Sequence, residues 1–220
     1  MVGKGQKIAT EASLLGGAII NGFNMHKIII SDGAGQFAIS LHGLCWVHEE
    51  RHYRKLIPIS EEERKEIEQI RSKIWDFYKE LKKYKINPKI SRREELSKLF
   101  DILFSKTYKS PNINDLLDRT RSRKKGLLLV LQYPFIPLHN NDSERDIREY
   151  VKKRKISGST RSDDGKQARD TFTSLKKTCM KLKICFYDYL KDRLSNTQKI
   201  QRLKNVIKKK SQYLSFSLST

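Results

Sequence analysis

The stretch from Ser60 to about Lys125 constrains the fold most, because its apolar residues recur with the period of an amphipathic α-helix. A long helix is expected from Ser60 onward. Its apolar stripe consists of Ile67, Ile70, Ile74, Phe77, Tyr78 and Leu81. A chain with this pattern over so much of its length is predicted to be dominated by helices.

Two further helices are expected in the same stretch, over Ser91–Phe104 and over Asn112–Lys125, with Pro111 near the start of the second. In the Ser91–Phe104 helix four residues are expected to face inward: Leu96, Leu99, Phe100 and Leu103. The run Leu127–Leu131 is apolar but too short to assign. We therefore expect a helical subdomain over residues 60–133.

Segments with strand character are few. Lys27–Asp32 contains a β-branched apolar run that stops at Asp32 and Gly33, as in a strand buried on both faces. A second short strand is expected around Leu44–Val47. The small residues Gly33–Gly35 would allow a tight turn beside Asp32. The fold class is therefore α/β, with helices predominating.

The charge of the chain points to its partner. The sequence has 220 residues, 37% of them apolar, and 46 Lys and Arg against 25 Asp and Glu leave a net charge of +21. Enough apolar residues are present for a core, and the positive field favours a polyanion. The sequence has no apolar run of the roughly 20 residues that span a bilayer. We expect a nucleic acid, not a membrane, as partner.

The cysteines and the N-terminus indicate the compartment. Cys45, Cys179 and Cys185 are too few and too irregularly spaced for a disulfide framework, which suits a reducing environment. The apolar stretch Leu14–Ile20 is interrupted by glycines and has no convincing cleavage site for a secretion signal. A cytoplasmic location is expected.

After Pro134 and Pro137 a new helix is expected to start near Glu144, with Ile147, Tyr150 and Val151 on its core face. The rest of this helix and the following loop are strongly basic. The side chains expected to contact DNA phosphates are Arg145, Arg148, Lys152, Lys153, Arg154, Lys155 and Arg161. The alternative for such a run is a solvated helix face, but the net charge favours DNA contact.

The chain is expected to close with helices over Asp163–Lys181 and Ile184–Asp192. The segment Ser195–Thr220 holds six basic residues and no acidic one, with weaker periodicity. We expect this segment to be a mobile basic tail. No base-reading motif is recognisable in the chain.

Two carboxylates are candidates for chemistry. Asp32 follows a buried strand, where α/β sheets place ligand-binding groups, although it could equally initiate a turn. Glu144 lies three residues after Asn141, as in a capping box, but it also borders the core-facing stripe and could point into a site. Asp142 lies close enough in the sequence to replace Glu144 as a ligand, but it is the less favoured of the two.

The segment Cys45–His48, with His42 and His52 nearby, raises the alternative of a zinc site, because cysteine and histidine are usual zinc ligands. The paired cysteine spacing of structural zinc sites is absent. We therefore expect Cys45, Trp46 and His48 to have structural roles near Asp32, with Trp46 anchoring the core.

Taken together, these segments resemble the transposases of the insertion-sequence-66 family. The resemblance rests on residues 31–37 (SDGAGQF), 44–51 (LCWVHEER), 137–148 (PLHNNDSERDIR) and 153–161 (KRKISGSTR), the last followed by Asp170-Thr171-Phe172. It extends from about Thr10 to Arg193.

The resemblance implies a ribonuclease-H-like fold with an Asp-Asp-Glu triad, in which Asp32 is the second Asp and Glu144 the Glu. The helical residues 60–133 would be inserted between them. Such a triad binds two Mg²⁺ (or Mn²⁺) ions and cleaves and joins phosphodiesters in double-stranded DNA, here the transposon ends. A homo-oligomer is compatible with this activity.

The family's first Asp has no clear counterpart. Glu11 is the only acidic residue before Asp32, and it lies in Ala9–Leu15, which favours a helix. We therefore expect a partial ribonuclease-H-like core whose N-terminal strands are missing, as in a transposase fragment that is inactive alone. The expected domains are residues 1–59 (partial core), 60–133 (insertion), 134–193 (closing helices) and 194–220 (tail).

Two other functions remain open. A noncatalytic DNA-binding protein, or a remnant of a mobile element, would need the basic surface but neither carboxylate. A ribonuclease or another phosphodiesterase would use the same metal chemistry on another substrate.

Overall fold

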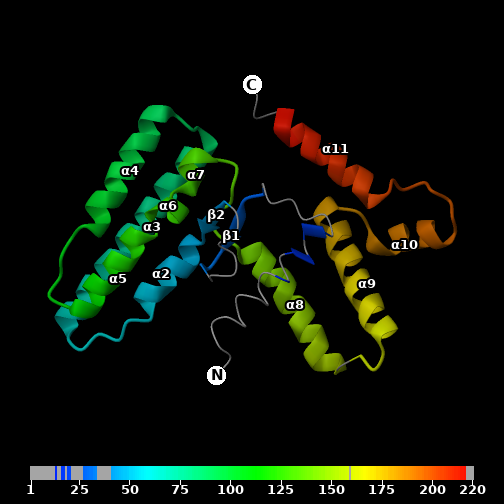
Figure 1. Ribbon diagram of the computed structural model, residues 1–220, viewed down its shortest axis with the longest axis horizontal. Coiled ribbons are helices and arrows are strands. Elements are labelled where there is room, and N and C mark those ends of the chain that lie inside the picture. Colours follow the sequence, from blue (N-terminus) through cyan, green and yellow to red (C-terminus); the bar gives the residue numbers. More distant parts are fainter. Residues whose placement is uncertain are drawn as a thin grey trace. The chain divides into compact units, whose positions relative to one another are not determined.

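A computed structural model describes residues 13, 16–17, 19–20, 27–33, 41–158 and 160–216 (Figure 1). The chain divides into two compact units, Met1–Asn141 and Asp142–Thr220, which are described separately. The sequence interpretations of Glu11 and of Ala34–Gly35 fall outside the described residues. None of the described helices is long and apolar enough to cross a lipid bilayer.

Unit 1 contains a parallel pair of three-residue strands, β1 (Ile29–Ser31) and β2 (His42–Leu44). Backbone hydrogen bonds extend the pair at both ends: Ile29 donates to Leu41 (2.9 Å) and Cys45 to Ser31 (2.9 Å). The expected first strand is confirmed. The described residues hold only these two strands, whereas a ribonuclease-H-like sheet needs more.

The second strand was predicted around Leu44–Val47, whereas β2 begins two residues earlier, at His42. It ends at Leu44, and residues 46–47 belong to helix α2 (Trp46–Arg54). The helix is preferred here because residues seven apart share one helical face, so that Trp46 and Tyr53 are both buried. A strand through Val47 would not bring these two aromatic rings to one side.

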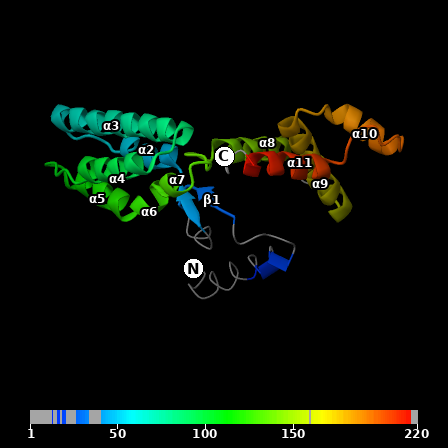
Figure 2. The ribbon, with the colours of Figure 1, turned by 90° about the horizontal axis from the view of Figure 1, so that it is seen from above.

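Four helices of unit 1 form a closed ring of contacts: α2, α3 (Glu61–Ile86), α4 (Ile90–Phe104) and α5 (Pro111–Ser122). Figure 2 shows α3 beside α2. The Ser60 hydroxyl accepts from the Glu63 amide (3.1 Å) and so caps α3. All six residues of the stripe expected in α3 are buried, which confirms that helix and its inward face.

The inward face of α4 is confirmed in part. Leu96 and Phe100 are fully buried and Leu103 packs against the core, but Leu99 is 41% exposed. Phe104 occupies the core instead, because it follows Leu96 and Phe100 at four-residue steps and so continues their row. The prediction for Leu99 is wrong.

The chain after α5 forms two single-turn helices, α6 (Lys124–Leu127) and α7 (Leu129–Gln132), and the whole run Leu127–Leu131 is buried. Both helices pack against β2 and so connect the strand pair to the helical core. The helix expected over Asn112–Lys125 therefore ends earlier, at Ser122.

Trp46 lies at the centre of this core. Its ring centroid is 5.4 Å from that of Phe77 and 6.2 Å from that of Phe100, and its indole N–H donates to the carbonyl of Leu127 (2.9 Å). The indole therefore contributes both aromatic packing and a satisfied polar group. The expectation that Trp46 anchors the core is confirmed.

Unit 2 consists of helices α8 (Asn141–Ser157), α9 (Asp163–Leu182), α10 (Phe186–Leu194) and α11 (Leu203–Phe216). A small core of Cys179, Tyr189 and Leu203 joins the last three. In the segment expected to be a mobile basic tail, residues 203–216 form a helix, and its first residue, Leu203, is buried. The helix expected from Ile184 begins at Phe186.

Candidate functional site

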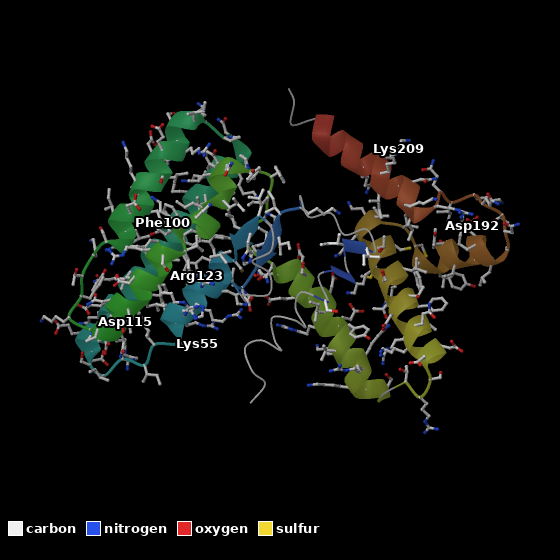
Figure 3. All side chains as sticks on the ribbon, viewed as in Figure 1. Lys55, Phe100, Asp115, Arg123, Asp192 and Lys209 are labelled. Atoms are coloured by element: carbon white, nitrogen blue, oxygen red, sulfur yellow. The ribbon has the colours of Figure 1, made fainter. Side chains whose placement is uncertain are left out.

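Asp32 directly follows β1, at the exposed carboxyl end of the strand, while its neighbour Ser31 is buried. The Asp32 carbonyl accepts a hydrogen bond from Nη2 of Arg123 (3.1 Å), a residue 91 positions later. Arg123, labelled in Figure 3, caps the C-terminal end of α5. Asp32 is thus exposed to solvent, while its backbone carbonyl is held by Arg123 at the end of α5.

The turn after β1 depends on Gly33. This residue has a φ of 92°, a region that side chains strongly disfavour. A Cβ at this position would lie 1.6 Å from Nη2 of Arg123. The Gly33 amide also donates to the Ser31 hydroxyl (3.0 Å). The glycine is required both by the backbone conformation and by the space that the guanidinium occupies.

His42 lies on the neighbouring strand, with Nε2 2.7 Å from the Ser31 hydroxyl oxygen. Burial lowers the pKa of His42, the Arg123 guanidinium lowers it further, and the Asp32 carboxylate acts in the opposite direction. The lowered pKa favours the neutral form of the His42 ring. A neutral ring accepts the Ser31 proton at Nε2, which leaves the Ser31 oxygen to accept from Gly33.

A buried chain of polar groups continues from Arg123. Its Nη1 donates to Oε2 of Glu49 (2.8 Å), and Oε1 of Glu49 accepts from the hydroxyl of Thr120 (2.7 Å). The Tyr53 hydroxyl lies 2.6 Å from the Thr120 oxygen. Glu49 is 2% exposed, so its charge is compensated by Arg123 within the protein. Both of its oxygens are occupied.

Sequence reasoning missed Arg123 and Glu49, although a signal for Glu49 was present. Glu49 lies three residues after Trp46 and four before Tyr53, so a helix puts it on the core face. A carboxylate there needs a cationic partner. The identity of that partner, 74 residues away, is not readable from local pattern.

Of the three residues expected to have structural roles near Asp32, Cys45 contacts the strand that precedes the turn. Cys45 is buried and its amide donates to Ser31, while the next amide, of Trp46, donates to the carbonyl of Leu138 (3.0 Å). His48 lies with Nε2 3.1 Å from Nη1 of Arg51. Among the described residues, no three His, Cys, Asp or Glu side chains are grouped so that they could bind a metal ion, zinc included.

Glu144 lies in the first turn of α8 and is half-buried. On α8, Asp146 and Glu149 form ion pairs with α9, and the shortest join Lys181 to Asp146 and Lys177 to Glu149. The Tyr150 hydroxyl adds a hydrogen bond to Asp170 (2.6 Å). These contacts define which face of α8 meets α9.

The opposite face of α8 carries Glu144. Residues 144, 147, 148 and 151 follow at helical spacing, roughly half a turn away from Asp146 and Glu149. Among them, Ile147 is 63% exposed and Val151 half-buried, and α8 has no buried residue in the part of the chain that the structure describes. The expected core position of Ile147 is therefore wrong. The helix packs on α9 through charged and polar groups instead.

All seven basic residues expected to contact DNA are exposed. Six lie on α8, and Arg161 lies in the loop before α9. Arg148, Lys152 and Lys155 share the side turned away from α9, and Arg145 forms one exposed ion pair with Asp142 (3.3 Å). The side chains are thus free of burial, as contact with a phosphate backbone requires.

Comparisons with known proteins add one family and one relative. The model of the family described as "Transposase IS66 family" matches residues 15–168, a span that contains both Asp32 and Glu144. The uncharacterized protein y4jO of Sinorhizobium fredii (strain NBRC 101917 / NGR234) is 43% identical over 188 residues. The match covers 86% of this chain but 59% of that relative. No solved structure matches the chain.

Proposed function

This chain belongs to the IS66 family of transposases, and we propose that it contributes Asp32 and Glu144 to metal-dependent cleavage and strand transfer of transposon DNA. In this proposal the strand pair belongs to a ribonuclease-H-like core, and residues 60–133 are inserted into it. The observation that carries the proposal is the position of Asp32 at the open carboxyl end of a parallel strand, on a turn fixed by Gly33 and Arg123.

The path of the chain supports the pairing of the two carboxylates. The Ser31 carbonyl next to Asp32 accepts from Cys45, and the following amide, of Trp46, donates to Leu138. Glu144 is the sixth residue after Leu138. Six residues span at most about 20 Å, so the length of the chain keeps Glu144 within that distance of Leu138.

Carboxylate oxygens are the ligands that Mg²⁺ and Mn²⁺ prefer, so the chemistry of Asp32 and Glu144 fits these ions. Within the described part of unit 1, the buried acid nearest the turn, Glu49, is committed to Arg123 and Thr120. A complete site therefore needs Glu144 and a further carboxylate. When bound, the ions would activate the attacking oxygen and stabilise the leaving one.

In the same proposal, the exposed basic residues of α8 bind the phosphates of the transposon ends. The net charge of +21 and the position of Arg148, Lys152 and Lys155 on one helix side support this assignment. The partner is double-stranded DNA.

The test is transposition in cells by a reconstituted full-length transposase that contains this chain as wild type or variant. We expect Asp32→Asn and Glu144→Gln each to abolish transposition without weakening DNA binding. The matched control is Asp115→Asn, since Asp115 is an exposed acid on α5, labelled in Figure 3. Transposition that survives Asp32→Asn would remove Asp32 from the catalytic set.

A noncatalytic DNA-binding protein is the second candidate. The exposed basic residues favour it, because binding of DNA phosphates by these residues requires neither Asp32 nor Glu144. In that case the wild-type chain binds duplex DNA in a salt-sensitive way and binds equally well after Asp32→Asn or Glu144→Gln, and the reconstituted full-length protein supports no transposition. Mg²⁺-dependent binding that both substitutions remove would instead favour the transposase.

A further inference from the structure

We propose that Arg123 is a positioning residue for Asp32 and that Glu49 holds Arg123 in place. The inference rests on the proposed catalytic role of Asp32 and adds to it the device that fixes the turn. Nothing in the family match assigns a role to either residue.

The geometry begins with the fork of the guanidinium. Nη1 of Arg123 donates to Glu49 on α2, and Nη2 donates to the backbone carbonyl of Asp32 at the end of β1. Because the guanidinium is planar and its N–H directions are fixed, one bond sets the direction of the other. The side chain of Arg123 therefore transmits the position of α2 to the turn after β1.

The turn accepts this contact only because residue 33 is a glycine. Nη2 of Arg123 occupies the space in which a Cβ of residue 33 would stand. The guanidinium thus lies directly against the backbone of the turn. Any movement of Arg123 leaves a gap beside Gly33 and frees the Asp32 carbonyl.

Glu49 is itself held in place by a hydrogen bond to the carboxylate oxygen that does not contact Arg123. Oε1 accepts from Thr120 on α5, and Thr120 contacts Tyr53 on α2. The carboxylate is 2% exposed and the Arg123 side chain 18% exposed. A buried ion pair contributes little net stability compared with apolar packing, so its value here lies in the geometry that it enforces.

The decisive variant is Arg123→Lys, because an ammonium keeps the charge but cannot form the two bonds of the fork. In the reconstituted full-length transposase we expect kcat for strand transfer to fall by about 10- to 100-fold, as for a reacting group misplaced by a small distance, with KM for DNA unchanged. Arg119→Lys is the matched control. Arg119 lies one turn earlier on α5, is exposed, and contacts His52 instead.

A second measurement needs no activity. Hydrogen exchange of the Gly33 amide, which donates to Ser31, should accelerate at least about tenfold in Arg123→Lys, while exchange of the amides of α3 stays unchanged. A merely structural role would accelerate exchange in α3 as well, because that helix lies in the same core. Unchanged exchange at Gly33 would overturn the proposal, and so would an unchanged kcat in an active protein.

The parallel variant Asp32→Asn separates this inference from the proposed function. If Asp32→Asn retains strand transfer, the catalytic role fails, and the exchange at Gly33 still decides whether Arg123 fixes the turn. If Asp32→Asn is inactive and Arg123→Lys behaves like Arg119→Lys in both measurements, the proposed function stands and the positioning role fails.

Discussion

The hydroxyl of Thr120 donates a hydrogen bond of 2.7 Å to Oε1 of Glu49, although the two residues are 71 positions apart in the sequence. Burial raises the pKa of Tyr53 above its usual range, so its hydroxyl stays protonated, and its oxygen lies 2.6 Å from that of Thr120. The three side chains are therefore linked by hydrogen bonds in a row that ends on a buried carboxylate. The stability of unit 1 should depend on it.

The first prediction concerns this chain. Thr120→Val keeps the shape of the side chain but leaves Oε1 of Glu49 without a donor. We expect the free energy of unfolding of unit 1 to fall by about 1–3 kcal/mol, the cost of an unsatisfied buried polar group. Urea denaturation measures this. Thr107→Val, at an exposed position, should change the free energy of unfolding by no more than about 0.5 kcal/mol. An equal loss of stability in Thr120→Val and Thr107→Val would contradict the role of the hydrogen-bond network.

The second prediction compares two neighbours on α4. Phe100 is fully buried against Trp46 and Phe104, whereas Leu99 is 41% exposed. Phe100→Ala should lower the free energy of unfolding by about 3–5 kcal/mol, as large aromatic truncations do in cores. Leu99→Ala should cost less than about 1 kcal/mol. A large loss for Leu99→Ala in the same denaturation experiment would mean that α4 is rotated.

The third prediction concerns DNA binding by α8. Replacing Arg148, Lys152 and Lys155 together with glutamine should make the slope of log K against log salt shallower by about 2–3, because each lost phosphate contact removes about 0.9. Titrations by fluorescence anisotropy at several salt concentrations measure the slope. The control replaces the exposed lysines 55, 65 and 98, which removes the same charge from unit 1. Identical slopes for both triple variants would remove α8 from the interface.

The fourth prediction is a pH dependence in unit 2. Asp192, labelled in Figure 3, accepts hydrogen bonds from the Thr197 hydroxyl (2.5 Å) and from the amides of Lys199 (2.7 Å) and Ile200 (3.3 Å). Thr197 above all, then Arg193 and these amides, hold the pKa of Asp192 well below its usual range.

Because the pKa of Asp192 is lower in the folded than in the unfolded state, its stabilisation is complete above the unfolded value of about 4 and is lost as the pH falls below it. Protection of the Lys199 and Ile200 amides from hydrogen exchange should therefore decrease between about pH 5 and pH 2. Asp192→Asn should lower protection already at pH 7, whereas Asp188→Asn, at an exposed position, should not. Equal protection in all three proteins would exclude the role of Asp192.

Most helices could be predicted from the sequence because their signal is local. The buried stripe of α3, from Ile67 to Leu81, follows from spacing alone. The prediction that Leu99 faces inward was wrong, because a wide apolar stripe does not reveal which of its edges the neighbouring helix covers. The helix over residues 203–216 was not predicted because its buried residue, Leu203, packs with residues of α9 and α10 that lie earlier in the sequence.

The candidate site was predictable to a smaller extent. The strand before Asp32 and the turn at Gly33 are local, and both are present. The residues that hold the turn come from α2 and from the end of α5, so their contacts depend on the packing of helices far apart in the sequence. A single sequence carries the residue types but not these pairings. Glu144 lies in the other unit, and its role stays a prediction.

The ionic contact between α8 and α9 has a practical consequence for purification. A protein of this charge retains cellular nucleic acid unless it is washed at high ionic strength. Such washing also screens the partly exposed ion pairs of Asp146 and Glu149 with Lys177 and Lys181. The step that cleans the preparation therefore loosens the helix pair that presents the basic side chains. Dialysis back to low salt should precede any measurement of affinity.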